Sequence, residues 1–216
     1  MSRTRIAVLV SGRGSNMAAL LRATLDPDYP ADIALVVSNV PSAGGILHAQ
    51  EQGVPFKVID HKTFDSREDH EDAVTQALKE AEIEFVCLAG YMRILSERFI
   101  KNWRGRLINI HPSLLPAFVG VDTHARAMER GVRVHGCTVH FVTGELDAGP
   151  IIAQRAVAVQ PDDTEEALAA RVLAQEHALY PLALQMVIEK RVRWSGDNAV
   201  VINGATGEDL SGLQSD

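Results

Sequence analysis

The sequence predicts an α/β protein with a Rossmann-like, mostly parallel sheet, helices on both faces and an antiparallel C-terminal extension. Two observations predict this class. Over the first half of the chain, apolar runs alternate with amphipathic segments, which is typical of βαβ units and a parallel sheet. After residue 134, two neighbouring runs instead alternate apolar with polar residues, which indicates an antiparallel pair.

The first half contains five largely apolar runs, which predict strands over residues 6–10, 33–37, 56–59, 85–89 and 106–110. The first of them is continuously apolar, which is typical of a strand buried on both faces. The helical spacing between them predicts helices from Asn16, over about 45–52 and over about 66–82.

The second half follows a different order of elements. It predicts strands over 134–143 and 151–159, a helix over about 163–190 and a short hairpin from 192, followed by a polar end. Asp163 followed by Glu166 is a helix-start pattern. Pro181 predicts a kink in that helix, because proline lacks a backbone N–H.

Composition narrows the classes of partner. The chain has 216 residues and a formal net charge of −7, so we expect no nucleic-acid partner, although a backbone nest can still hold a small phosphorylated ligand. Cys87 and Cys137 lie among apolar residues, which favours two core residues over a disulfide. We also expect a cytoplasmic protein without a signal peptide, a membrane span or a membrane partner, and one domain over residues 1–216.

The most informative stretch is the apolar run that ends in a proline-rich loop, Ile108 to Pro116. Side chains alternate between the faces of a strand, so Asn109 and His111 emerge on one face where the strand ends. In open α/β sheets, ligands bind at that end of the strands. An amide can donate to an oxyanion, and an imidazole can donate or move a proton. The pattern predicts the active site here.

The turn Ser11-Gly12-Arg13-Gly14-Ser15-Asn16 joins the first predicted strand to the first helix. It lacks the Lys of a phosphate-binding P-loop, and Met17 stands where a dinucleotide fingerprint needs a third glycine. Two interpretations stay open. It is either a plain turn with Ser15 capping the helix or an anion site at a helix N-terminus.

Two acidic residues stand out. Asp147 lies in the glycine-bounded turn 144–149, where it either serves turn geometry or orients His111 as a third catalytic group. Glu176 shares an apolar helical stripe with Leu168 and Val172. It either reaches water at the edge of the stripe or meets a partner or ligand, because an unpaired buried charge is costly.

Four histidines fall within thirty residues: His111, His124, His135 and His140. Without a cysteine pair or a His-Glu-x-x-His pattern they do not predict zinc, and we expect no metal. His140 shares a strand face with Thr138, so both are candidate polar contacts in a pocket. His135 is expected to be a surface or strand-entry residue.

Together these motifs closely resemble the folate-dependent glycinamide ribonucleotide formyltransferases of purine biosynthesis. The resemblance runs from Arg5 to about Arg193. It is carried by residues 11–16, Ala89-Gly90-Tyr91-Met92-Arg93-Ile94-Leu95, Asn109–Pro116, His135–Phe141, Glu145–Pro150 and Gln175-Glu176-His177. Val119 and Gly144 depart from the residues common in the family, but neither departure removes a catalytic group.

The resemblance implies a role for each matched position. Residues 1–110 would form a phosphate-binding half, 111–193 a catalytic and folate-binding half, and 194–216 a hairpin and tail. The substrate phosphate and ribose would be bound by Gly14, Ser15, Asn16 and Glu176. The folate would be bound by Arg67, Met92, Arg93, Ile94, Leu95, Asn109, Thr143, Gly144, Glu145, Leu146 and Asp147. The co-substrate would be 10-formyltetrahydrofolate, the acceptor glycinamide ribonucleotide, and the protein a monomer or a homodimer.

The implied chemistry is direct formyl transfer. The substrate amine would attack the formyl carbon, Asn109 and His111 would hold the resulting oxyanion, and Asp147 would orient His111 and assist proton transfer. No metal or covalent enzyme intermediate is expected.

Within the superfamily that the chain resembles, the closest rival is formyltetrahydrofolate hydrolase, which carries a regulatory domain before the catalytic part. A methionyl-tRNA formyltransferase carries an additional RNA-binding domain, and a sugar-nucleotide formyltransferase lacks this form of the glycine loop. From another class, a non-catalytic folate- or nucleotide-binding module would keep the pocket without needing the Asn109, His111 and Asp147 set.

Overall fold

The computed structural model describes residues 3–196, 200–204 and 206–212, in two compact units that divide after Ile108. The strands are β1 Thr4–Val10, β2 Ala31–Ser38, β3 Phe56–Val58, β4 Phe85–Leu88, β5 Leu107–His111, β6 Val134–Phe141, β7 Ile151–Ala158, β8 Val192–Trp194 and β9 Val200–Ile202. The helices are α1 Ser15–Thr24, α2 Gly44–Glu51, α3 Arg67–Glu80, α4 Glu97–Asn102, α5 Thr123–Glu129, α6 Glu165–Ile188 and α7 Gly207–Ser211, with a 3₁₀ turn, η1, at His61–Thr63.

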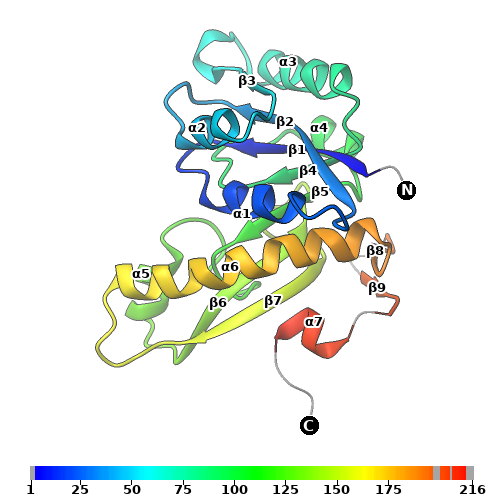
Figure 1. Ribbon diagram of the computed structural model, residues 1–216. Helices are drawn as coiled ribbons and strands as arrows, with labels where there is room; N and C mark the ends of the chain where they lie inside the picture. Colours follow the sequence, from blue (N-terminus) through cyan, green and yellow to red (C-terminus); the bar gives the residue numbers. More distant parts are fainter. Residues whose placement is uncertain (1–2, 197–199, 205, 213–216) are drawn as a thin grey trace. The chain divides into compact units, whose positions relative to one another are not determined.

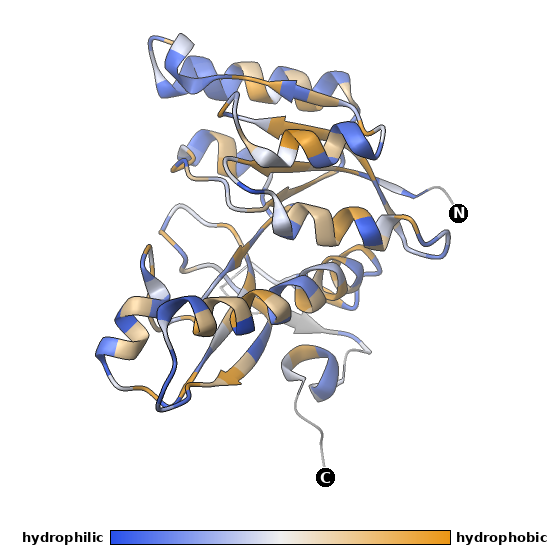
Figure 2. Ribbon diagram, turned by 60° about the vertical axis from the view of Figure 1, so that its left-hand side comes forward, coloured by the Kyte–Doolittle hydropathy of each residue, from blue (hydrophilic) through white to orange (hydrophobic). Residues whose placement is uncertain are grey.

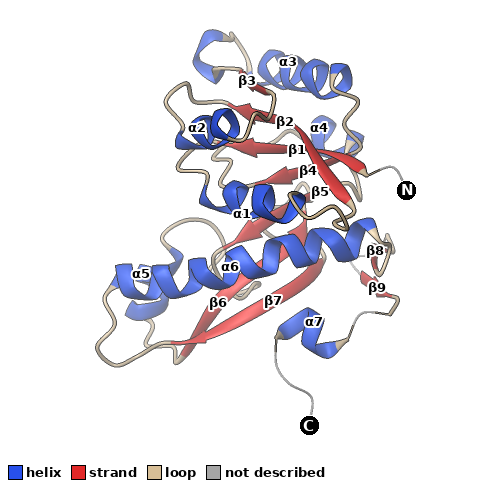
Figure 3. Ribbon diagram, viewed as in Figure 1, coloured by secondary structure: helices blue, strands red, loops and turns tan. Residues whose placement is uncertain are grey.

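Hydrogen-bonded strands follow the order β3-β2-β1-β4-β5-β6-β7, a mixed sheet that is mostly parallel and ends in the antiparallel pair β6–β7 (Figure 3). The fold class predicted from the sequence is confirmed. The eight strands and helices predicted in the first half are present to within two residues at the ends that were predicted, and the tail forms the predicted hairpin β8–β9. The single-domain prediction stays a prediction.

The first unit is built on strands that are apolar on both faces. Residues 6–10 of β1 are fully buried, and β1 pairs in parallel with β2 on one side and β4 on the other. The chain therefore moves outward from β1 to β3 and then returns to β4. Connections between parallel strands are right-handed, so α1 and α2 cover one face of the sheet. The helices that follow β3, namely α3 and α4, cover the other face (Figure 1). The order of connection reverses between β1 and β4, and ligands bind beyond the strand ends at such a point.

The second unit packs the long helix α6 on the β6–β7 pair. Its apolar stripe is buried, and Figure 2 shows its mixed polar and apolar faces. The helix continues through Pro181. The cap is Thr164, whose side chain accepts from the N–H of Ala167, and not Asp163 as the sequence pattern predicted. Asp163 instead pairs with Arg171 at 2.6 Å, so that prediction was wrong by one residue.

The sequence did not predict α4, α5, α7 or η1. These helices have three to seven residues, which is too short for a periodic pattern of apolar positions. Side-chain caps mark the starts of α4 and α7: Ser96 accepts from the N–H of Phe99, and Thr206 forms a capping box with Asp209. The start of α5 has no side-chain cap. Among the described residues, every helix is too short or too polar to cross a membrane.

Candidate active site

In the second unit, three polar side chains predicted from the sequence lie together at the end of β5. His111 Nδ1 is 3.4 Å from Asp147 Oδ2, and both side chains are more than nine-tenths buried. His111 Nε2 is 3.0 Å from the carbonyl oxygen of Phe118. Both ring nitrogens of His111 therefore face oxygen acceptors, which fixes the plane of the ring.

Asp147 is positioned by its own turn. Its φ of 50° lies in the left-handed region, which aspartate tolerates better than most residues. The N–H of Gly120 donates to Asp147 Oδ2 at 2.9 Å. Asp147 also lines a cavity of about 420 Å³ together with Leu115, Pro116 and Gly149. The Leu115–Pro116 peptide bond beside it is cis.

Asn109 is oriented by His140 on the neighbouring strand. Asn109 Nδ2 lies 3.2 Å from His140 Nε2, and His140 Nδ1 lies 2.9 Å from the carbonyl oxygen of Phe141. Burial lowers the pKa of His140 below its usual value, so the ring is neutral near pH 7. A neutral ring that gives its Nδ1 proton to a carbonyl accepts at Nε2, so His140 accepts from the amide of Asn109. The second N–H of that amide is then available to a ligand.

The hydroxyl group of Thr138, which the sequence predicted as a second pocket contact, is already hydrogen-bonded within the protein. It donates to the Ser113 carbonyl, and it accepts from the N–H of Leu115 and from Gln154 Nε2. A hydroxyl has one proton and two lone pairs, so these three bonds use its full capacity. Its contacts support the loop that follows β5.

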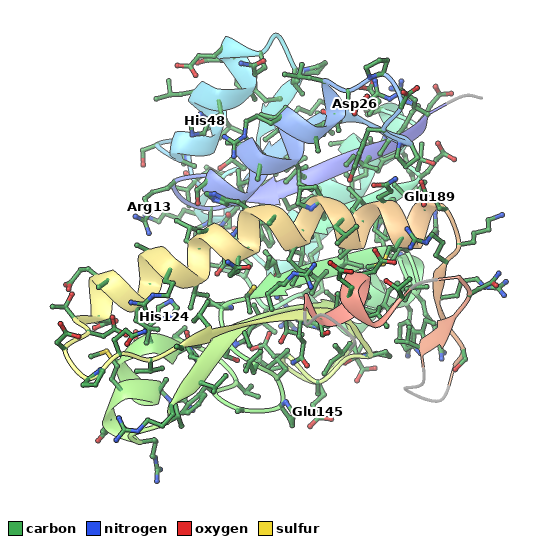
Figure 4. The ribbon with its side chains drawn as sticks, turned by 60° about the horizontal axis from the view of Figure 1, so that its bottom comes forward. Arg13, Asp26, His48, His124, Glu145 and Glu189 are labelled. Carbon is green, nitrogen blue, oxygen red and sulfur yellow. The ribbon has the colours of Figure 1, made fainter. Side chains whose placement is uncertain are left out.

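His135 is the second residue of β6, so it is a strand-entry residue as the sequence suggested, but it lies in the core and not at the surface. It is 1% exposed, and its ring makes edge-to-face contacts with Phe118 and His124. Burial, with smaller contributions from the neighbouring His124 and His111, lowers the pKa of His135 to about 4. The alternation rule failed to place it because a strand end covered by a loop is buried on both faces. His124, labelled in Figure 4, lies on α5, and burial lowers its pKa as well.

Glu176 lies on the buried stripe of α6 and is 6% exposed. Burial is the main cause of the raised pKa of Cys137, which is about 12, and the charge of Glu176 is the second cause. Glu176 therefore lies inside the unit and not at a water-exposed edge, which removes one of the two interpretations left open by the sequence.

Residues 144–146 of the turn are exposed, and Thr143 before them is half-buried. The Thr143 hydroxyl donates to the carbonyl of Glu145, and Leu146 is 55% exposed. Glu145, labelled in Figure 4, lies in this surface turn. The side chains of residues 145 and 146 are therefore accessible from the surface.

In the first unit, the glycine loop leads directly into α1. Gly14 has φ 77° and is the N-cap, and a Cβ at this position would lie 2.5 Å from the Cα of Gly45. Both the backbone angle and the close approach therefore require glycine. Ser15 is the first residue of the helix and makes no side-chain cap, so the capping interpretation was wrong. The N–H groups of the first turn point out of the helix end, where an anion is favoured.

Two further elements of the first unit carry residues that the resemblance singled out. The loop of residues 90–96 follows β4, and its Met92 and Ile94 side chains are 73% and 71% exposed. Arg67 is the first residue of α3, half-exposed, with Nη2 3.5 Å from Glu68 Oε1. In Figure 4, Arg13 marks the glycine loop after β1. No group of three potential metal-binding side chains occurs among the residues that the structure describes.

Sequence reasoning missed several contacts. These are the acceptor at Phe118, the donor at Gly120 and the serine–asparagine pair at the start of the glycine loop. The amino-acid sequence does not show which backbone groups form hydrogen bonds, and it predicts Ser11 only as part of a turn.

The chain matches the family model described as "Formyl transferase" over residues 4–184. It is 49% identical over 192 residues to the trifunctional purine biosynthetic protein adenosine-3 of Gallus gallus, covering 89% of this chain but 19% of that protein. It is 41% identical over 199 residues to the phosphoribosylglycinamide formyltransferase of Escherichia coli K12, covering 92% of this chain and 93% of that protein.

Solved structures of formyl-group enzymes are also similar to this chain. A phosphoribosylglycinamide formyltransferase from Anaplasma phagocytophilum has a TM-score of 0.88 at 41% identity and covers 97% of this chain and 98% of its own. A formyltetrahydrofolate deformylase from Pseudomonas syringae has a TM-score of 0.85 at 31% identity, covering 94% of this chain and 66% of its own.

The fold and the cluster at the end of β5 define the class of formyl-group transferases. The chain belongs to the formyl transferase family, in the branch of the phosphoribosylglycinamide formyltransferases that it matches over nearly their full length.

Proposed function

We propose that this protein transfers the formyl group of 10-formyltetrahydrofolate to the primary amine of glycinamide ribonucleotide, a step of purine biosynthesis. The observation that carries the proposal is the cluster of Asn109, His111 and Asp147 at one strand end. Family membership supports the reaction class, and the match to phosphoribosylglycinamide formyltransferases of equal length supports the acceptor.

In this proposal, Gly14, Ser15 and Asn16 bind the substrate phosphate. The first turn of α1 supplies backbone N–H groups and the positive end of the helix dipole, which favour a dianion without a lysine. Glu176 binds the ribose, because a carboxylate accepts from two vicinal hydroxyl groups and its burial makes those bonds strong.

The folate would be bound by the residues named from the resemblance: Arg67, the segment 92–95, Asn109 and the turn 143–147. Met92 and Ile94 provide apolar surface for a planar ring, and Arg67 provides a cation for the glutamate end of the folate. The folate is a co-substrate that leaves after each turnover. The proposal needs no metal.

The chemistry begins when the amine nitrogen attacks the formyl carbon. The new C–N bond converts the formyl oxygen to an oxyanion. The free N–H of Asn109 donates to that oxygen, with its amide held in the required orientation by His140. His111 supplies a second N–H when the oxyanion replaces the Phe118 carbonyl as its acceptor.

Collapse of this intermediate breaks the bond to N10 of the folate. A proton must leave the attacking amine, and a proton must reach N10. Asp147 is the group that moves it, through a water, while it also keeps His111 in place. The products are the formamide and tetrahydrofolate, so no electron donor or acceptor is required.

Hydrolysis is the second reaction to consider, because the Pseudomonas syringae deformylase shares the fold. That relative is less similar in sequence than the phosphoribosylglycinamide formyltransferases reported above. The test is to follow tetrahydrofolate release from 10-formyltetrahydrofolate with and without glycinamide ribonucleotide. Release that depends on the amine supports transfer, and equal release without it supports hydrolysis.

A cytoplasmic location, small molecules as the only ligands, and a monomer or homodimer stay predictions from the sequence. Size-exclusion chromatography with light scattering decides between the two oligomeric states.

A further inference from the structure

The loop of residues 90–96 combines exposed apolar side chains with fixed ends. Met92 and Ile94 are among the most exposed large apolar residues described. A loop that offers such side chains to a ligand binds it more tightly if it is already held in shape, because less conformational entropy is lost on binding.

Ser11 holds the beginning of this loop. The backbone N–H of Ser11 donates to the Gly90 carbonyl at 3.1 Å, and the N–H of Met92 donates to Ser11 Oγ at 2.7 Å. Ser11 is the residue after β1, and Gly90 lies two residues after β4. These bonds tie the two strand ends on either side of the point where the order of connection reverses.

Asn39 fixes the direction of the Ser11 hydroxyl. Ser11 Oγ donates its single proton to Asn39 Oδ1 at 2.5 Å, which turns its lone pairs toward the N–H of Met92. Asn39 is 2% exposed, and His61 Nδ1 lies 2.9 Å from its backbone carbonyl oxygen and 3.2 Å from its side-chain Nδ2. The hydroxyl that holds Met92 is therefore itself held by a buried side chain.

Glu71 holds the end of the loop. This residue of α3 is 3% exposed, and its carboxylate accepts from the N–H of Ser96 at 2.7 Å and from the Ser96 hydroxyl. Ser96 Oγ also accepts from the N–H of Phe99 and so begins α4. Bonds to an ionised carboxylate are stronger than those between neutral groups.

We propose that Ser11 and Glu71 are positioning residues for folate recognition, which hold the 90–96 loop at both ends so that Met92 and Ile94 meet the folate ring. Because Ser11 is also the first residue of the glycine loop, one hydroxyl links the loop that would bind the phosphate to the loop that would bind the folate. The inference rests on the proposed function and on the role proposed there for residues 92–95.

The experiment compares Ser11→Ala and Glu71→Gln with the wild type in steady-state formyl transfer. Loss of one hydrogen bond predicts a rise of about 3- to 10-fold in KM for 10-formyltetrahydrofolate in Ser11→Ala, with KM for glycinamide ribonucleotide and kcat changed less. Glu71→Gln keeps one acceptor and the shape of the side chain, so it should shift the same KM in the same direction and stay folded.

Two matched controls separate positioning from general destabilisation. Ser38→Ala removes another buried hydroxyl of the first unit, whose bonds stay within its own turn at Val40. Asp72→Asn weakens a different link between α3 and α4, the 2.7 Å pair with Arg98. Neither should change KM for the folate.

Hydrogen exchange of the 90–96 amides gives a readout that does not need activity. Faster exchange of the Met92 amide in Ser11→Ala, with the higher folate KM, supports the proposal. Faster exchange with an unchanged folate KM overturns it, as does an equal rise of KM for both substrates. If the wild type itself transfers no formyl group, the proposed function fails first and the positioning role falls with it.

Discussion

The imidazole of His111 and the carboxylate of Asp147 face each other at 3.4 Å although they are 36 positions apart in sequence, and both are buried. β5 delivers the histidine and the turn after β6 delivers the aspartate. The Gly120 N–H donates to the same carboxylate oxygen that faces the ring, and the Phe118 carbonyl oxygen faces the other ring nitrogen. Backbone groups therefore hold both members of the pair.

Asp147→Asn should lower kcat by about 10²- to 10⁴-fold, the range typical of a lost proton-transfer group. The amide keeps the size of the side chain but cannot carry the proton. Rapid mixing with both substrates measures the rate. Glu129→Gln, at the exposed last position of α5 in the same unit, is the control and should retain activity. Near wild-type turnover in Asp147→Asn would remove this residue from the mechanism.

The Asn109–His140 contact predicts coupling between two substitutions. Asn109→Ala should lower kcat by about 10²- to 10³-fold, as expected for one oxyanion donor. His140→Phe should lower it less, because the amide remains but loses its orientation. In the double variant the effects should be far from additive, since both act on one donor. Additive effects in this double-mutant cycle would show that His140 does not act through Asn109.

Gly14→Ala should weaken binding of glycinamide ribonucleotide and destabilise the first unit. The added Cβ meets the Gly45 backbone, and a φ of 77° is unfavourable for alanine by about 1–2 kcal/mol before that clash is counted. Gly12→Ala is the control in the same loop, because its added Cβ meets no atom within 4 Å. Urea denaturation and the KM for the amine substrate should separate the two variants, and equal behaviour would contradict the structural account.

Acid should destabilise the protein through His135. Its pKa is about 4 in the folded protein and 6.5 in an unfolded chain, so between these values the unfolded state binds more protons. Above pH 6.5, His135 therefore makes its full contribution to the free energy of unfolding, and this contribution is lost as the pH drops toward 4. At pH 4.5 the loss from His135 is about 2–3 kcal/mol.

The lowered pKa values of His124 and His140 act in the same direction. His135→Gln should therefore reduce the difference in unfolding free energy between pH 7 and pH 4.5 without abolishing it. His48→Gln on α2, at the half-exposed position labelled in Figure 4, is the control. An unchanged pH profile in His135→Gln would show that this ring does not set acid stability.

The elements with a long periodic pattern could be predicted from the sequence because burial imposes that pattern directly. β1 is a continuous apolar run, as a strand buried on both faces requires, and α6 carries its apolar stripe at helical spacing. The start of α6 lies one residue later than predicted because Asp163 and Thr164 are both good capping types, and only the Asp163–Arg171 pair decides between them.

The candidate site could be predicted only in part from the sequence. Asn109, His111 and Asp147 are marked by chemically distinctive side chains at strand ends. The contacts of Ser11, Glu71 and His140 could not be predicted, because each acts through a residue that is distant in sequence. Two of those partners are backbone N–H groups, and the third is the side-chain amide of Asn109. The burial of His135 depends on the Phe118 loop, which has no periodic signal.

The most direct test of the central claim uses 10-formyltetrahydrofolate labelled with ¹³C in the formyl group, mixed with the protein and glycinamide ribonucleotide in a single turnover. NMR then follows the label. The account predicts that the label passes quantitatively to the amide of the formylated product, and that formate appears only at the uncatalysed rate when the amine is left out. Labelled formate released at the turnover rate without the amine would contradict direct transfer and identify the protein as a hydrolase.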